Sequence, residues 1–227
     1  MPGMPRRSIF TAVSSLAVVA VLAAGCTGER GDEEAPPDAE ALLASAADEM
    51  AQVDTVRLHI GADTALADLP VREADAVVTR AGDAQGSAQI EQFGQVLELE
   101  FVLAGDTFYY QLIGPWLELP REKAAEYYDP TAILDPERGV AHLLRNADQA
   151  EVRGTGDAGG VDAYEVGASF AAADLAALLP GVPEQVDGTL WIGQERPLLH
   201  RAEFSLPGGT VTVELSDFDA PVEIRAP

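Results

Sequence analysis

Cys26, the one cysteine of this 227-residue chain, is the side chain whose setting most clearly predicts chemistry. It follows an uncharged stretch from Ile9 to Gly25, which Arg6 and Arg7 precede. A basic start, a short apolar run and small residues before a cleavage point are typical of a secretory signal peptide. A small-residue run that ends in cysteine is the lipobox pattern, in which the thiol receives a diacylglyceryl group, the signal is cut before the cysteine, and the new N-terminus is usually acylated. Ala23 stands three residues before Cys26, where a lipobox usually has leucine.

Lipidation of Cys26 predicts a lasting membrane attachment, because two or more acyl chains hold a protein where one chain would be marginal. The apolar stretch is shorter than the roughly 20 residues of a membrane span, and an exported protein seldom keeps one unpaired thiol, so a single-pass helix and a free cysteine are less favoured. We expect residues 1–25 to be a lipoprotein signal peptide, residues 26–38 the lipidated cysteine with a flexible acidic tether, and residues 39–227 the folded domain. The expected location is the outer face of the plasma membrane, in the extracytoplasmic cell envelope.

The remaining residues offer no catalytic constellation. His59, His142 and His200 lie far apart, none of them with a partner at metal-ligand spacing. The chain has no His-Glu-x-x-His, no Gly-x-Ser-x-Gly and no glycine loop that would cradle a phosphate. Carboxylate pairs are too frequent in so acidic a chain to mark acid–base catalysis. The sequence therefore predicts a protein that is not an enzyme and that needs no cofactor and no metal.

The charge of the chain is strongly negative. It has 38 Asp and Glu against 14 Lys and Arg. Loss of Arg6 and Arg7 with the signal would leave 38 acids and 12 bases, a formal net charge of −26. Such a surface repels nucleic-acid phosphates. It is either a solvated surface or a field that steers a cationic partner.

Alternation of apolar and polar residues with period two predicts about eleven strands, spaced for an antiparallel meander rather than for crossover helices. Val56, Leu58 and Ile60 share one face of the first strand. The expected strands are Val56–Ile60, Ala74–Thr79, Gln85–Gln92, Leu97–Leu103, Thr107–Ile113, Ala150–Gly154, Ala163–Ser169, Gly188–Gly193, Leu198–Leu206, Thr210–Leu215 and Val222–Ile224.

Helical patterns interrupt these strands. One helix is expected from Asp38 or Ala39, with Leu42, Leu43, Ala46, Ala47 and Met50 on one stripe. Others are expected at Pro120–Tyr128, at Ala171–Leu179 before Pro180-Gly181, and after Asp135, taken as N-cap with Pro136 in the first turn. Because the helices are short and alanine-rich, the large apolar face of the sheet either packs a filled core or lines a cavity.

Several stretches resemble one known family in their order and spacing. They are Gly105–Tyr110, Gly114–Trp116, Ile133–Leu144, Gly160–Val166, Gly188–Gly193 and Leu215–Phe218. Together they are similar to the LppX/LprG (LppX_LprAFG) family of actinobacterial cell-envelope lipoproteins, from about Asp38 to the C-terminus. The lipobox agrees with this resemblance.

The resemblance implies an α+β fold: a curved antiparallel half-barrel sheet with helices on its concave side, enclosing a hydrophobic cavity as in periplasmic lipoprotein carriers. It also implies that residues 39–227 bind lipid, holding the acyl chains of triacylated lipids or glycolipids for envelope lipid transport, often beside a major-facilitator exporter. The expected protein is a monomer anchored to the plasma membrane. The alternative is a non-enzymatic scaffold lipoprotein that docks an envelope protein through its acidic face.

The alternation and the helix stripes predict which side chains line the cavity. From the strands these are Val56, Leu58, Ile60, Leu97, Leu99, Phe101 and Leu103, and from the helices Leu143, Leu144, Leu175, Leu178 and Leu179. Tyr109, Tyr110 and Trp116 are amphipathic and could border its mouth, although packing at a sheet edge would suit them equally well.

Overall fold

The computed structural model describes residues 36–63, 71–92, 95–126, 129–179, 182, 184–207 and 209–227. Residues Pro36–Pro227 form one compact unit. The expected signal peptide, Cys26 and most of the tether lie outside the described residues, as do Tyr127, Tyr128, Pro180 and Gly181. None of the helices in the described part combines the length and the apolar character that a membrane crossing requires.

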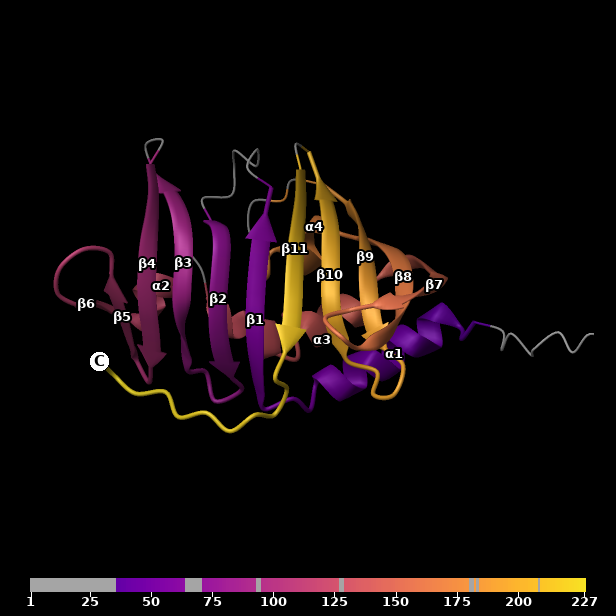
Figure 1. Cartoon of the computed structure of the whole chain (residues 1–227), viewed down its shortest axis with the longest axis horizontal. Helices are drawn as coiled ribbons and strands as arrows, with labels where there is room; N and C mark the ends of the chain where they lie inside the picture. Colours follow the sequence, from indigo (N-terminus) through magenta and orange to yellow (C-terminus); the bar gives the residue numbers. More distant parts are fainter. Residues whose placement is uncertain are drawn as a thin grey trace, which may run out of the picture. The chain divides into compact units, whose positions relative to one another are not determined.

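The described part of the chain folds into one 11-stranded antiparallel sheet, in the order β6-β5-β4-β3-β2-β1-β11-β10-β9-β8-β7 (Figure 1). The strands are β1 (Thr55–Ala62), β2 (Val71–Thr79), β3 (Ala84–Gln92), β4 (Gln95–Ala104), β5 (Thr107–Gln111), β6 (Leu117–Pro120), β7 (Asp148–Asp157), β8 (Asp162–Phe170), β9 (Val186–Gly193), β10 (Leu199–Leu206) and β11 (Gly209–Ser216). The sheet is curved and open, with β6 and β7 at its two ends. This confirms the predicted half-barrel class.

The path of the chain explains where the helices lie. The chain starts at the centre with β1, meanders outward to β6, crosses to the opposite end at β7, and meanders back to β11 beside β1. The crossing carries α2 (Arg121–Ala125), the 3-10 helix η1 (Pro130–Leu134) and α3 (Val140–Arg145). With α1 (Ala39–Met50) and α4 (Ala172–Leu175), these segments lie behind the sheet in Figure 1. They therefore cover one face, which we call the concave face, and leave the other, the outer face, open.

Alternation sorts apolar side chains onto the concave face. Val56 and Leu58 of β1 stand opposite Val78 and Ala76 of β2, and all four are buried. The same face continues through Phe204 of β10, which lies opposite Val211 of β11. Because cross-strand partners point to the same side of a sheet, these rows form one continuous core with the helices.

Helix α1 begins where the sequence predicts. The Asp38 side chain accepts a hydrogen bond from the Ala41 amide at 2.9 Å and so caps the first turn. Leu43, Ala46, Ala47 and Met50 form the buried stripe. Small alanines on this stripe let α1 approach α3 closely, and α1 also touches β7 and β9.

Helix α3 begins later than predicted. Asp135 does not cap a helix at Pro136; its carboxylate accepts the amides of Glu137 and Arg138 and closes a turn, and the helix starts at Val140. Burial raises the pKa of Asp135, but hydrogen bonds from Arg138 and the backbone outweigh this and hold the pKa below its usual value. Gly139 separates turn and helix because its extended backbone fits closely against η1: a Cβ there would overlap the carbonyl oxygens of this segment.

One predicted strand is absent from the structure, and one observed strand was not predicted. Val222–Ile224 is not a strand: Asp217 and Asp219 adopt positive φ, and the chain then leaves the sheet as a tail along the strand ends (Figure 1). Conversely, the short β6 was missed because it has only four residues and ends in proline. The predicted helices at Pro120–Tyr128 and Ala171–Leu179 are both shorter in the described residues, as α2 and α4.

Candidate functional site

The helix-covered part of the concave face is closely packed. Val56, Leu58, Phe101 and Leu103 from the strands are at most 8% exposed. The predicted helical residues are buried against them: Leu143, Leu144, Leu175, Leu178 and Leu179. All nine residues belong to one contiguous cluster of buried side chains, so in this conformation the helices close over this part of the sheet. The prediction that they line a lipid cavity stays a prediction.

Two contacts hold the helical cover together. Nε2 of His142 in α3 donates to Oδ1 of Asp174 in α4 at 2.9 Å. Arg145 of α3 donates to Asp48 of α1 at 3.0 Å. The first bond is half-buried and the second is exposed, so the link between α3 and α4 is the better protected from solvent competition.

At the edge of the sheet where β4 begins and β1 ends, the apolar face runs past the helical cover. Leu97 and Leu99 of β4 point to the same side as Phe101 but are only partly buried and lie outside the closed core. Ile60 of β1 flanks that core and is also partly exposed. These three predicted lining residues therefore face space that the helices leave open.

An aromatic row continues this open part to the end of the sheet. The ring of Phe101 stacks on Phe108 with centroids 5.8 Å apart, and Phe108 stacks on Tyr110 at 6.0 Å. Tyr110 in turn stands opposite Leu117 of β6, which is 51% exposed. Phe108 was not among the predicted lining residues, although its place two residues before Tyr110 in an alternating strand could have revealed it.

The residues expected at the mouth lie on different faces. Tyr110 belongs to the concave face. Tyr109 stands opposite Val102 on the outer face, and Trp116 borders a depression there. Their role at a mouth remains untested.

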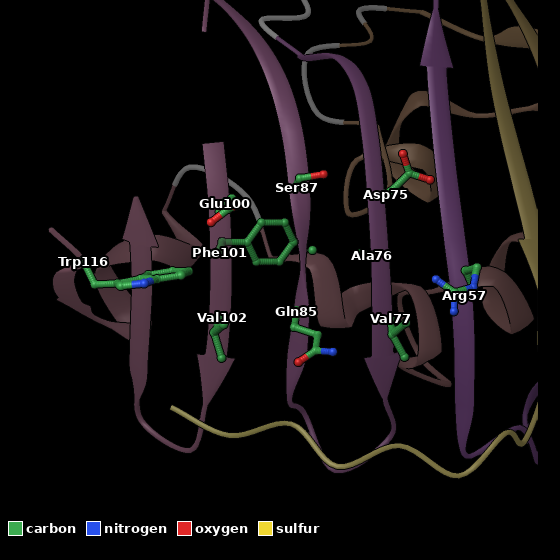
Figure 2. Close-up of a pocket in the computed structure, with 11 residues that line it drawn as sticks. Arg57, Asp75, Ala76, Val77, Gln85, Ser87, Glu100, Phe101, Val102 and Trp116 are labelled. Atoms are coloured by element: carbon green, nitrogen blue, oxygen red, sulfur yellow. The ribbon is translucent and has the colours of Figure 1, made fainter. Parts of the chain in front are cut away.

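That depression on the outer face has a volume of about 410 Å³ and is lined by polar and apolar groups in about equal measure. Figure 2 shows its floor on β1 to β4, with Arg57 and Asp75 at one end and Trp116 at the other. The remaining lining is Ala76, Val77, Gln85, Gly86, Ser87, Glu100, Phe101 and Val102. Charged and amide groups would remain unsatisfied beside hydrocarbon, so this depression does not suit an acyl chain.

The histidines occupy three different settings. On the outer face, His59 pairs with Asp75 at 3.0 Å, and together with Glu73 these groups offer ligand atoms within 4.8 Å of one another. Two donors on one tetrahedral zinc ion lie about 3.4 Å apart, so the three exposed or half-exposed side chains would have to move together to hold a metal. The sequence did not reveal this group because its members lie on two strands. His200 is half-buried: burial lowers its pKa, and its ring meets Phe218 edge-on, with the ring centroids 5.2 Å apart.

Fold and site together define a class of protein. An open antiparallel sheet with one apolar face, partly covered by short helices and partly bare, is suited to holding an apolar ligand. The match of the LppX_LprAFG lipoprotein family model to residues 38–224 then places the chain: it belongs to this family of cell-envelope lipoproteins.

The relatives agree with this assignment. The chain is 31% identical to the lipoarabinomannan carrier protein LprG of Mycolicibacterium smegmatis, over 100% of this chain and 99% of that protein. It is 32% identical to the protein of the same name from Mycolicibacterium hassiacum, over 96% and 97%. The crystal structure of LprF from Mycobacterium bovis superposes with a TM-score of 0.77 at 25% identity, covering 85% of this chain and 98% of LprF. LppX from Mycobacterium tuberculosis shares the fold, with a TM-score of 0.64 at 20% identity over 83% of this chain and 100% of LppX.

Proposed function

We propose that this protein is a lipid carrier, anchored through Cys26 to the outer face of the plasma membrane, which holds the acyl chains of a triacylated lipid or glycolipid against its concave face. One observation carries the proposal: the apolar face does not end at the helical cover but continues through Leu97, Leu99 and Tyr110 to the exposed Leu117. The names of the LprG relatives, which describe carriers of lipoarabinomannan, support a glycolipid as cargo.

The need for such a protein follows from the free energy of hydrocarbon in water. Transfer of an acyl chain of about 15 methylenes from a bilayer to water costs a free energy on the order of 12 kcal/mol. A carrier must therefore replace the bilayer with apolar side chains along most of each acyl chain. The open part of the concave face supplies the first such surface, and the polar head group would stay outside it.

Deeper insertion needs room beneath the helices. Leu143 and Leu175 are buried in the same cluster as Val56 and Leu58, so acyl chains can reach these two strand residues only if the cover moves outward. The bond between His142 and Asp174 joins α3 to α4, which favours their movement as one piece. Binding of this kind makes and breaks no covalent bond and needs no cofactor.

The family resemblance also supports two finer points of the proposal. The protein would work as a monomer, since one concave face suffices for one lipid. It would receive or deliver cargo beside a major-facilitator exporter, through polar and acidic surface outside the apolar face.

Native mass spectrometry of the purified domain tests the carrier function. The domain Pro36–Pro227 is expected to bind added triacylated glycolipid at one molecule per chain. Leu99→Trp fills the open part of the concave face and is expected to abolish loading, whereas Val96→Trp, on the outer face of the same strand, is expected to load normally. A domain that stays free of lipid in every mixture, or equal loading of the two variants, would contradict the proposal. If the domain instead carries no lipid and binds a protein partner through its acidic side chains, in a way that salt disrupts, the scaffold function would be favoured.

A further inference from the structure

Large exposed hydrophobic side chains gather at one place on the described surface. Ile113 is 89% exposed, Leu117 51% and Leu112 40%. All three belong to the turn between β5 and β6 or to its edge, while the other such residue, Val96, lies on the outer face of β4. We call residues 112–117 the apolar loop. Single exposed apolar residues are ordinary, but three within six positions mark a contact surface.

The apolar loop is also free of charge. From Thr107 to Leu117 the chain has no Asp, Glu, Lys or Arg, although the whole chain has 38 acids. Two kinds of amphipathic aromatic residue flank the exposed aliphatic tip: Tyr110 before it and Trp116 after it. Tyrosine and tryptophan beside an apolar segment are typical of side chains that sit at a membrane–water interface.

The loop keeps a defined shape. Gly114 adopts a φ of +94°, which glycine tolerates, and the Gln111 side-chain amide donates to the Gly114 carbonyl. The turn lies at the β6 end of the sheet (Figure 1), and Ile113 within it is largely exposed. Ile113 is thus exposed because of the turn that presents it.

We propose that the apolar loop docks this protein on the surface of the lipid bilayer, with Ile113, Leu117 and Leu112 inserted among the acyl chains of the outer leaflet. The proposal is independent of whether the protein carries lipid. A bilayer is favoured over a protein partner because an uncharged aliphatic tip with an aromatic border matches its layered polarity, and because the chain belongs to a family of lipoproteins, which work at a membrane.

The two ends of the domain make this docking geometrically possible. Helix α1 begins at the β7 end of the sheet, whereas the apolar loop lies at the β6 end (Figure 1). Eleven strands span roughly 50 Å. The twelve residues from Thr27 to Asp38 reach about 40 Å at full extension, so a lipidated cysteine can hold one end near the bilayer while the loop holds the other. Docking would therefore lay the long axis of the sheet along the membrane.

Vesicle flotation with the non-acylated domain Pro36–Pro227 tests the proposal. The domain should bind phosphatidylcholine vesicles weakly, and added sodium chloride should not release it, because insertion is apolar. Ile113→Asp should lower the partition coefficient at least about tenfold, since it removes the most exposed inserted side chain and adds a charge. Val96→Asp is the matched control, because it places the same charge at a half-exposed valine outside the loop, and should bind as the unchanged domain does.

Quenching of tryptophan fluorescence by brominated lipid tests directly whether the apolar loop lies in the bilayer. The chain has two tryptophans, Trp116 and Trp191. In a Trp191→Phe variant, phosphatidylcholine brominated near its head group should quench Trp116. In a Trp116→Phe variant, Trp191, on the outer face beneath Arg201, should not be quenched.

Three results would overturn the proposal. The first is equal vesicle binding by the Ile113→Asp and Val96→Asp variants. The second is quenching of Trp116 that persists after the vesicles are removed, because it would report a bound cargo lipid. The third is a dimer that Ile113→Asp dissociates, without vesicle binding, which would assign the loop to a second copy. Native mass spectrometry of the Ile113→Asp variant, mixed with detergent-dispersed glycolipid, measures lipid loading without a bilayer. This measurement distinguishes a loss of membrane docking from a loss of lipid binding.

Discussion

Truncation of two leucines to alanine separates the closed core from the open part of the concave face. Leu143 of α3 is 1% exposed, whereas Leu99 of β4 is only partly buried and lies outside the core. Leu143→Ala should lower the free energy of unfolding by about 2–5 kcal/mol, because it removes buried methyl groups and leaves a cavity. Leu99→Ala should lower it by less than about 1.5 kcal/mol, since solvent already reaches that side chain.

Thermal and urea unfolding of the domain measure this difference. For a domain of this size, each 1 kcal/mol shifts Tm by about 2–4 °C, so a loss of 3 kcal/mol at Leu143 corresponds to about 6–12 °C. The order reverses for cargo: Leu99→Ala should weaken glycolipid binding about tenfold, the equivalent of about 1.4 kcal/mol of lost apolar contact. If Leu99→Ala destabilises the lipid-free domain as strongly as Leu143→Ala does, Leu99 is a core residue and our assignment of the open face is wrong.

Two further predictions concern stability. Gly139→Ala should cost about 1–3 kcal/mol in urea unfolding, because its Cβ would overlap carbonyl oxygens of η1, whereas Gly154→Ala, whose Cβ meets nothing within 4 Å, should be neutral within about 0.5 kcal/mol. Equal effects of the two substitutions on the free energy of unfolding would mean that η1 and α3 can move apart without loss of stability. Burial lowers the pKa of His200, so the unfolded chain binds its proton more readily. Stability should therefore fall as pH drops from the ordinary histidine pKa of about 6.5 to the lower pKa of the folded state, and the loss should level off below that. His200→Phe should flatten this part of the pH–stability curve, and an unchanged slope would place the effect elsewhere.

Local patterns were enough to predict most of the sheet. Alternation identified the faces of β1 and β4, and Asp38 with its alanine-rich stripe identified α1, because each of these signals lies within one element. The predicted start of α3 was wrong because the helix begins after Gly139, whose backbone packs closely against η1. That contact forms only in the folded state, so local sequence patterns do not reveal it. The same limit applies to the site. Leu99 and Leu103 look alike in the sequence, and only the position of the helical cover makes one open and the other closed.

The pairing of β1 with β11 sets the order in which the sheet can be completed. Strand β1 begins near the start of the domain and β11 ends it, yet the two are neighbours at the centre of the sheet. During synthesis from the N-terminus, β1 to β6 emerge first, and the hydrogen-bonding edge of β1 stays unpaired until the last strand arrives. An unpaired edge is a template for aggregation, so this protein stays vulnerable until its final strand has been made and has paired with β1. Loss of even the last forty residues would thus open the middle of the molecule rather than trim its end.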